Sequence, residues 1–247
     1  MPQHVILVGE APLTPALAAR AQAAALPTRV YVLDPHRPSG AGSAEAWTTV
    51  LAQAPEAVAA VELVDTDLDF KRATLQALDQ ALPPGAPILT STLAVTAAEA
   101  ATWLRHPRRL VGLALLPPLT ETSRAELAVA SEQASGLAAA RALLDQLGLP
   151  VEMVQDTAGG VVPRIVAGLI NEAAFALGEG VASAEAIDEA MRLGVAYPRG
   201  PLTWARDIGY ARVVAILDAL HREMPDGRYR VAPWLRQQAR RQRQVME

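Results

Sequence analysis

The chain of 247 residues contains no cysteine. Disulfide bonds, thiolate metal sites and cysteine nucleophiles are therefore excluded. The four histidines do not have the spacing of a metal-binding motif, so we expect no metal site. A chain without cysteine is compatible with a reducing compartment, and we expect a cytoplasmic protein.

Strong charge and long apolar runs are also missing. A net charge of −4 argues against nucleic acid or an anionic membrane surface as the main partner. No apolar run has the length of a membrane span, and no signal peptide is evident at the N-terminus. Arginines gather near the C-terminus at Arg236, Arg240, Arg241 and Arg243. They indicate a solvated helix face, with nucleic-acid contact as the alternative.

Aromatic residues make up 4% of the chain, although 51% of it is hydrophobic. Alanine, leucine and valine therefore carry the apolar content, which favours helices and buried parallel strands over an aromatic-rich sandwich. The single lysine, Lys71, stands against many arginines. We interpret that bias as genome composition. The length allows one large domain or two modest ones.

Strand-like and helix-like segments alternate through the first half. Short β-branched or apolar runs predict strands at 4–9, 29–33, 57–64, 87–91, 110–116, 126–130 and 151–154. Helical patterns occur at 13–25, 44–52, 70–81, 97–104 and 135–147. This alternation predicts an α/β domain with a doubly wound parallel sheet over residues 1–155.

No strand-like run remains after Asp156, so residues 156–247 are expected to form an all-helical domain. Helices are predicted at 161–177, 183–193, 201–208, 210–223 and 234–245. The first of these is apolar on most faces, as is typical of a helix central to a bundle or at a dimer interface.

The segment from Gly180 to Pro201 joins a helix with defined ends to a rigid turn. Ser183 is a good N-cap, and Gly194 suits the end of the helix. Two prolines then fix the chain on both sides of Gly200. The segment is either an ordinary helical hairpin or a family signature.

With its surroundings, this segment resembles the C-terminal domain of 3-hydroxyacyl-CoA dehydrogenases. The resemblance is strongest from Asp156 to about Ala239, and it favours the C-terminal repeat of the longer enzymes associated with phenylacetate breakdown. Its motifs are Asp156-Thr157-Ala158-Gly159, Asn171-Glu172, Tyr197-Pro198-Arg199-Gly200-Pro201-Leu202, Asp207-Ile208-Gly209 and Arg228-Tyr229-Arg230 before Pro233-Trp234-Leu235. The resemblance implies a degenerate Rossmann-like domain, an all-α domain that forms a homodimer, and NAD as the cofactor.

The expected cofactor loop departs from the dinucleotide pattern. A phosphate-binding turn needs G-x-G-x-x-G, whereas residues 9–14 keep only the first glycine, Gly9. Glu10 adds a negative charge near the expected pyrophosphate, and Pro12 removes an amide donor. Asp34 lies where the family has its ribose-binding acid, although an acid before proline is also a common loop cap. Gly9 and Asp34 are therefore candidate remnants of an NAD site that has lost most of its cradle.

The family's proton-transfer residues are changed as well. In the family a histidine accepts the substrate proton and a glutamate orients it, which is the logic of a base and its partner. Ala114 occupies the histidine position, and Glu126 follows twelve residues later at the glutamate position. Glu126 is thus a candidate remnant, with an exposed acid at a strand edge as the alternative. None of the four histidines offers an evident replacement for the base.

Two further family positions hold the substrate oxygen through a serine and an asparagine. The resemblance places Ser91 at the serine if a short insertion is allowed, whereas an ungapped alignment places Leu93 there. Pro163 occupies the asparagine position, and proline has no side-chain hydrogen-bonding group.

These changes favour a catalytically impaired homologue that binds an acyl-CoA or a companion dehydrogenase subunit. An active NAD-dependent dehydrogenase with a displaced base is the first alternative. A purely structural dimerisation module is the second.

Overall fold

The computed structural model describes residues 3–33, 44–131 and 134–244. The chain divides into two compact units, residues 1–160 and 161–247. Within the described residues, no helix is both long enough and apolar enough to cross a membrane.

The N-terminal unit is built on a seven-stranded sheet with the order β2-β1-β3-β4-β5-β6-β7. Its strands are β1 (His4–Glu10), β2 (Thr28–Leu33), β3 (Ala57–Leu63), β4 (Ile88–Ser91), β5 (Leu110–Ala114), β6 (Ala125–Ala128) and β7 (Val151–Met153). The Rossmann-like prediction is confirmed, but the sheet is not wholly parallel because β6 runs antiparallel to β5. The segment between these two strands contains no helix, and a parallel return needs a longer crossover connection.

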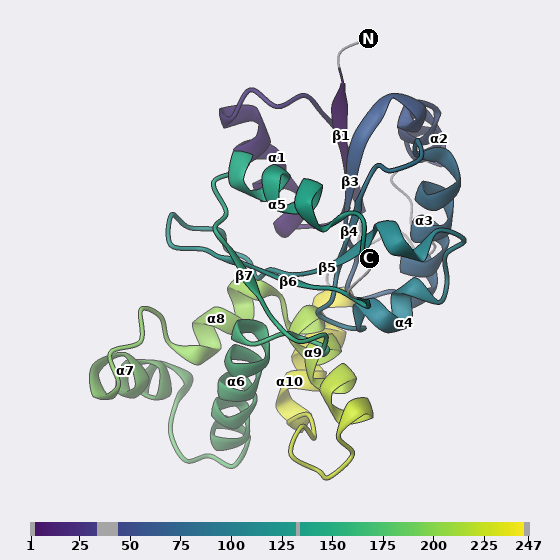
Figure 1. Ribbon diagram of the computed structural model, residues 1–247. Coiled ribbons are helices and arrows are strands. Elements are labelled where there is room, and N and C mark those ends of the chain that lie inside the picture. The colour runs from purple at the N-terminus through teal and green to yellow at the C-terminus, as the bar shows by residue number, and fades with distance from the viewer. Residues whose placement is uncertain (1–2, 34–43, 132–133, 245–247) are drawn as a thin grey trace. The chain divides into compact units, whose positions relative to one another are not determined.

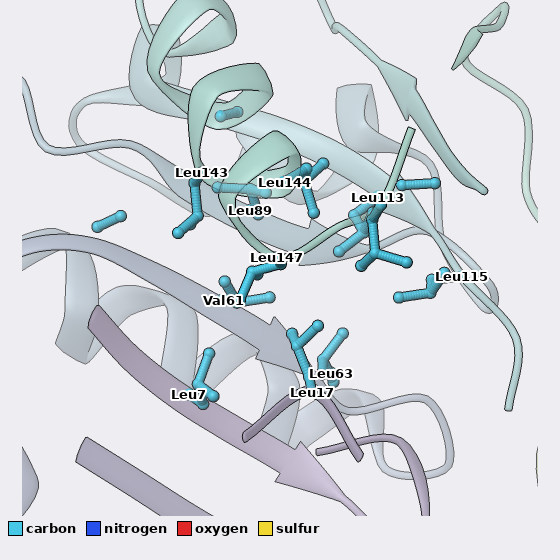
Figure 2. Packing of buried hydrophobic residues seen from close by; sticks show 14 of the residues in the cluster. Leu7, Leu17, Val61, Leu63, Leu89, Leu113, Leu115, Leu143, Leu144 and Leu147 are labelled. Atoms are coloured by element: carbon cyan, nitrogen blue, oxygen red, sulfur yellow. The ribbon is translucent and has the colours of Figure 1, made fainter. Parts of the chain in front are cut away.

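Helices cover both faces of this sheet (Figure 1). They are α1 (Leu13–Ala23), α2 (Ala44–Ala52), α3 (Leu68–Ala81), α4 (Ala97–Ala101) and α5 (Leu137–Gln146), with short 3-10 turns η1 (Ala54–Glu56) and η2 (Pro107–Arg109). On one face, α1 and α5 pack on alternate residues of the central strands, as Figure 2 shows for Leu7, Val61 and Leu89. On the other face, α2, α3 and α4 cover a second cluster that includes Ile6 and Ile88.

Helix α4 ends three residues earlier than predicted. The amide of Trp103 bonds to the carbonyl of Ala100 at 3.1 Å, and the amide of Leu104 bonds to Ala101 at 3.2 Å. These bonds span three residues, so the last turn tightens beyond the α-helix proper.

The C-terminal unit consists of helices in its described residues. They are α6 (Val162–Gly178), α7 (Ala184–Gly194), α8 (Pro201–Ile208), α9 (Tyr210–Glu223) and α10 (Pro233–Gln244). Helix α6 contacts each of the other four, and it buries residues such as Ala167, Ile170 and Ala174. The predicted helix that is apolar on most faces is therefore central to the bundle.

The Gly180–Pro201 signature has a structural explanation. Ser183 caps α7, and Asp188 on α7 accepts the amides of Leu202 at 2.8 Å and Thr203 at 2.9 Å. The Thr203 hydroxyl also donates to Asp188, at 2.7 Å. A Cβ at Gly200 would collide with the Asp188 carboxylate. Asp188 therefore caps α8 from the neighbouring helix, and this contact requires glycine at 200.

Asn171 ties α6 to the segment before α10. Its side-chain amide donates to the carbonyl of Arg230 at 3.0 Å, and its oxygen accepts the amide of Ala232 at 2.8 Å. Since Asn171 is buried, these two bonds satisfy polar atoms that would otherwise destabilise the core. The Asn171-Glu172 motif thus has a packing role in this chain.

Candidate functional site at the carboxyl end of the sheet

The strand order identifies where a ligand would bind in the N-terminal unit. The chain runs from β1 to β2 on one side of β1, and then crosses to β3 on the other side. This reversal is a topological switch point, and doubly wound sheets bind ligands outside the carboxyl ends of the strands there. The crevice between the ends of β1 and β3 is therefore the candidate cofactor site.

Gly9 lies at this crevice and allows the two strands to approach closely. Its φ is +153°, and a Cβ at this position would lie 2.5 Å from the carbonyl oxygen of Leu63 on β3. The glycine is needed for strand packing whether or not a phosphate binds.

Glu10 bridges the crevice. Its Oε1 accepts the amides of Asp65 at 3.1 Å and Thr66 at 2.8 Å, together with the Thr66 hydroxyl at 2.7 Å. The side chain is buried, at 7% exposure. A carboxylate held there opposes the negative charge of a pyrophosphate.

The loop after Glu10 offers little else to a dinucleotide. Pro12 is the N-cap residue of α1 and provides no amide, and Thr14 is fully buried in the first turn. Asp34, the predicted ribose ligand, lies outside the described residues. The described residues of this loop therefore do not fit the usual pyrophosphate cradle.

The two predicted proton-transfer positions are direct neighbours. Ala114 on β5 pairs with Glu126 on β6 in the antiparallel register. Glu126 is 5% exposed, and β6 lies between β5 and β7. The alternative of an exposed acid at a strand edge is therefore wrong. A spacing of twelve residues becomes one cross-strand pair because the strands form an antiparallel hairpin-like connection.

Gly160 closes over this pair, which the sequence did not predict. A Cβ at Gly160 would collide with Oε2 of Glu126 and would lie 3.0 Å from the Cβ of Ala114. The preceding residue, Gly159, donates its amide to the carbonyl of Thr92 at 2.7 Å. The Asp156–Gly160 segment thus brings its backbone against the Ala114–Glu126 pair, and the two adjacent glycines were the available indication.

Ser91 does not face this pair. It is the register partner of Leu113, whereas Glu126 pairs with the next residue, Ala114. Successive strand residues point to opposite faces, so Ser91 and Glu126 lie on opposite faces of the sheet. The buried Ser91 hydroxyl donates to Oδ1 of Asp65 at 2.5 Å.

A buried ion pair lies under the ends of β3 and β4. Lys71 Nζ lies 2.6 Å from Oε2 of Glu62, and both side chains are 0% exposed. Thr90 donates to the same oxygen at 2.6 Å, and Lys71 also donates to the carbonyl of Val64 at 3.0 Å. Burial raises the pKa of Glu62, and the Lys71 charge opposes that rise. The lone lysine, interpreted from sequence as compositional bias, is a structural residue beside the site.

The described histidines of this unit are at the opposite end of the sheet. His4 begins β1, and His106 precedes η2 and β5. His36 lies outside the described residues.

In the C-terminal unit, Pro163 is buried in the first turn of α6, where its fixed φ suits a helix start.

Comparison with known proteins now adds to this geometry. The model of the 3-hydroxyacyl-CoA dehydrogenase C-terminal domain matches residues 159–245. A 3-hydroxybutyryl-CoA dehydrogenase of Bradyrhizobium diazoefficiens is 32% identical over 202 residues, which cover 77% of this chain and 69% of that protein. The chain belongs to the 3-hydroxyacyl-CoA dehydrogenase family.

Other relatives agree with this membership. A probable 3-hydroxybutyryl-CoA dehydrogenase of Bacillus subtilis is 32% identical over 190 residues. That match covers 75% of this chain and 65% of the relative, so the chain spans just under two thirds of it. A 3-hydroxyadipyl-CoA dehydrogenase of Escherichia coli is 46% identical over 96 residues, covering 39% of this chain and 20% of that protein.

Solved structures extend the likeness over nearly the whole chain. The (S)-3-hydroxybutyryl-CoA dehydrogenase of Ralstonia eutropha superposes with a TM-score of 0.73 and 26% identity. The comparison covers 96% of this chain and 93% of that one. FadB2 of M. tuberculosis has a TM-score of 0.78 at 21% identity, covering 97% and 94% of the two chains, and supports the fold.

Proposed function

We propose that this chain is a catalytically impaired member of the dehydrogenase family that binds an acyl-CoA or a companion dehydrogenase subunit. The Ala114–Glu126 pair carries the proposal, because a methyl group stands where the family resemblance places the base. Loss of a general base costs about 10²–10⁴-fold in rate. In the family the glutamate orients the base, so we expect Glu126 by itself not to sustain that reaction.

The cofactor crevice supports the same proposal. Glu10 bridges the switch point, and residues 11–14 lack the glycines of a pyrophosphate cradle. The described histidines at the amino end of the sheet are poorly placed to replace the base. NAD therefore remains a cofactor by family, and tight binding to this chain is not expected.

Titration of the purified protein with NADH and, separately, with acetoacetyl-CoA tests the proposal. NADH fluorescence and calorimetry measure binding, and absorbance at the NADH band measures reduction. We expect acetoacetyl-CoA or a companion subunit to bind without turnover. Tight NADH binding with measurable reduction would instead support the alternative, an active dehydrogenase with a displaced base, which the names of the relatives favour.

We further propose that the C-terminal unit forms a homodimer. Val162 and Ile165 on α6 are 55% and 58% exposed, and Leu193 at the end of α7 is 73% exposed. Exposed apolar side chains of this kind favour a protein interface. Analytical ultracentrifugation of the wild type and of Ile165→Glu measures the oligomeric state of each protein. A stable dimer that binds neither NADH nor acyl-CoA would favour the purely structural module.

The names of the relatives support a proposal for the metabolic setting. We place the chain in cytoplasmic acyl-CoA metabolism, in fatty-acid or aromatic degradation of the phenylacetate type. The match to a 3-hydroxyadipyl-CoA dehydrogenase supports that setting. Binding of a panel of acyl-CoA thioesters with and without a terminal carboxylate tests it.

A further inference from the structure

The crevice at the switch point contains a set of hydrogen-bond donors directed at one atom. The amides of Asp65 and Thr66 and the Thr66 hydroxyl all donate to Oε1 of Glu10. Two adjacent amides and a hydroxyl that converge in this way form a concave anion site. The acceptor comes from β1, whereas the donors follow β3 in the chain.

The same donor set occurs a second time in the protein. In the C-terminal unit, Asp188 accepts the amides of Leu202 and Thr203 and the Thr203 hydroxyl. Two adjacent amides plus the hydroxyl of the second residue thus take a carboxylate in both units. In the helical unit the acid caps a helix, whereas at the switch point it lies where the fold places a ligand.

We propose that the Asp65–Thr66 donors form a carboxylate-binding site that the chain fills from within by Glu10. A ligand whose acidic group enters this crevice must displace Glu10. This site rests on the proposed function, because it requires a crevice that holds no dinucleotide. Glu10 occupies the space, and the carboxylate of a ligand is the chemical class that can replace it.

Chemical rescue of Glu10→Ala tests this site. Removing the side chain takes the shared acceptor away from the amide of the buried Asp65 and from the two donors of the half-buried Thr66, so we expect the unfolding midpoint to fall. Sodium formate supplies the missing carboxylate, and sodium chloride at equal ionic strength is the control. We expect formate to raise the midpoint of Glu10→Ala beyond the effect on wild type. Formate has three non-hydrogen atoms, which limits its affinity to a dissociation constant of about 1 mM or higher.

Amide resonances locate the rescue. Formate is expected to shift the Asp65 and Thr66 amides of Glu10→Ala and to leave those two amides unmoved in Asp188→Ala, which loses the matching acid elsewhere. Equal formate responses in wild type and Glu10→Ala, or a response away from these two amides, overturn the proposal.

Glu10→Gln keeps the size of the side chain and one acceptor, so it tests the proposal in a folded protein. Hydrogen exchange at Asp65 and Thr66 is expected to speed up, because a charged acceptor holds an amide more strongly than a neutral one. Formate should not slow it, since the site stays filled. Unchanged exchange overturns the proposal. NADH turnover by wild type, in contrast, would refute the proposal of an impaired enzyme. The formate measurements would still show whether the Asp65 and Thr66 donors bind a carboxylate.

Discussion

Replacing Lys71 by methionine removes one partner of the buried ion pair beneath the candidate site. The ammonium group lies 2.6 Å from Glu62 and 3.0 Å from the carbonyl of Val64. Thr90 remains as a donor to Glu62 in the variant. Because Glu62 is fully buried, its carboxylate would lose the charge that compensates it. Breaking such a pair costs about 3–5 kcal/mol, so we expect a loss of that size at pH 7.

The loss depends on pH in a defined direction. Burial raises the pKa of Glu62 and Lys71 lowers it, so removal of Lys71 raises this pKa further. The folded variant then holds a proton on Glu62 at pH values where the unfolded chain has lost it. Stability of the variant therefore falls as pH rises from the ordinary glutamate pKa through the raised folded pKa, and it is retained below that window. The difference from wild type shrinks as the pH is lowered from 7 to 5.

Urea unfolding at pH 5 and pH 7, monitored by hydrogen exchange of the β3 and β4 amides, measures this loss of stability in the N-terminal unit. The double variant Glu62→Gln/Lys71→Met is the matched control, because it leaves no buried charge at this position. It should be more stable at pH 7 than the single variant and less dependent on pH. A single variant that loses less than about 1 kcal/mol, with no pH dependence, would refute the reasoning.

Three further predictions test the site and the signature. The imidazole introduced by Ala114→His should have a higher pKa, by about 1, than the same imidazole in Ala114→His/Glu126→Gln, because the Glu126 carboxylate lies directly opposite. An NMR titration measures the imidazole pKa in both variants, and equal values would contradict the pairing. Gly160→Ala should lower the stability of the N-terminal unit by about 1–3 kcal/mol in urea unfolding, since its φ is +58° and a Cβ would strike Glu126. Gly200→Ala and Asp188→Ala should each destabilise the C-terminal unit by about 1–2 kcal/mol, and additive losses in the double variant would show that they act separately.

Local patterns predicted the elements well because their causes are local. Alternating strand and helix patterns identified the strands of the N-terminal sheet, with ends displaced by a few residues. Ser183 caps α7 as predicted, since an N-cap bonds to an amide three residues away. The resemblance likewise identified the family, which the relatives confirm.

The candidate site was harder to predict, because its contacts join distant parts of the chain. The family resemblance placed Ala114 and Glu126 at functional positions, and only the antiparallel register made them neighbours. Ser91 resembled a substrate residue in sequence, but the pleat directs it to the opposite face from Glu126. The roles of Ser91, Glu126 and Gly9 in binding stay predictions.

The sequence by itself determined the succession of strands and helices along the chain and the helical character of its second half. It also put Ala114 where the resemblance expects a base, and it kept only Gly9 of the glycines in the dinucleotide pattern. These properties depend on residue identity and on spacing within a few turns of the chain. Tertiary structure decided that Glu10 reaches Asp65 and Thr66, that Gly160 covers Glu126, and that Lys71 is buried against Glu62. The order of the strands within the sheet and the pleat bring those groups together. Neither follows from local sequence, because both depend on which distant segments pair.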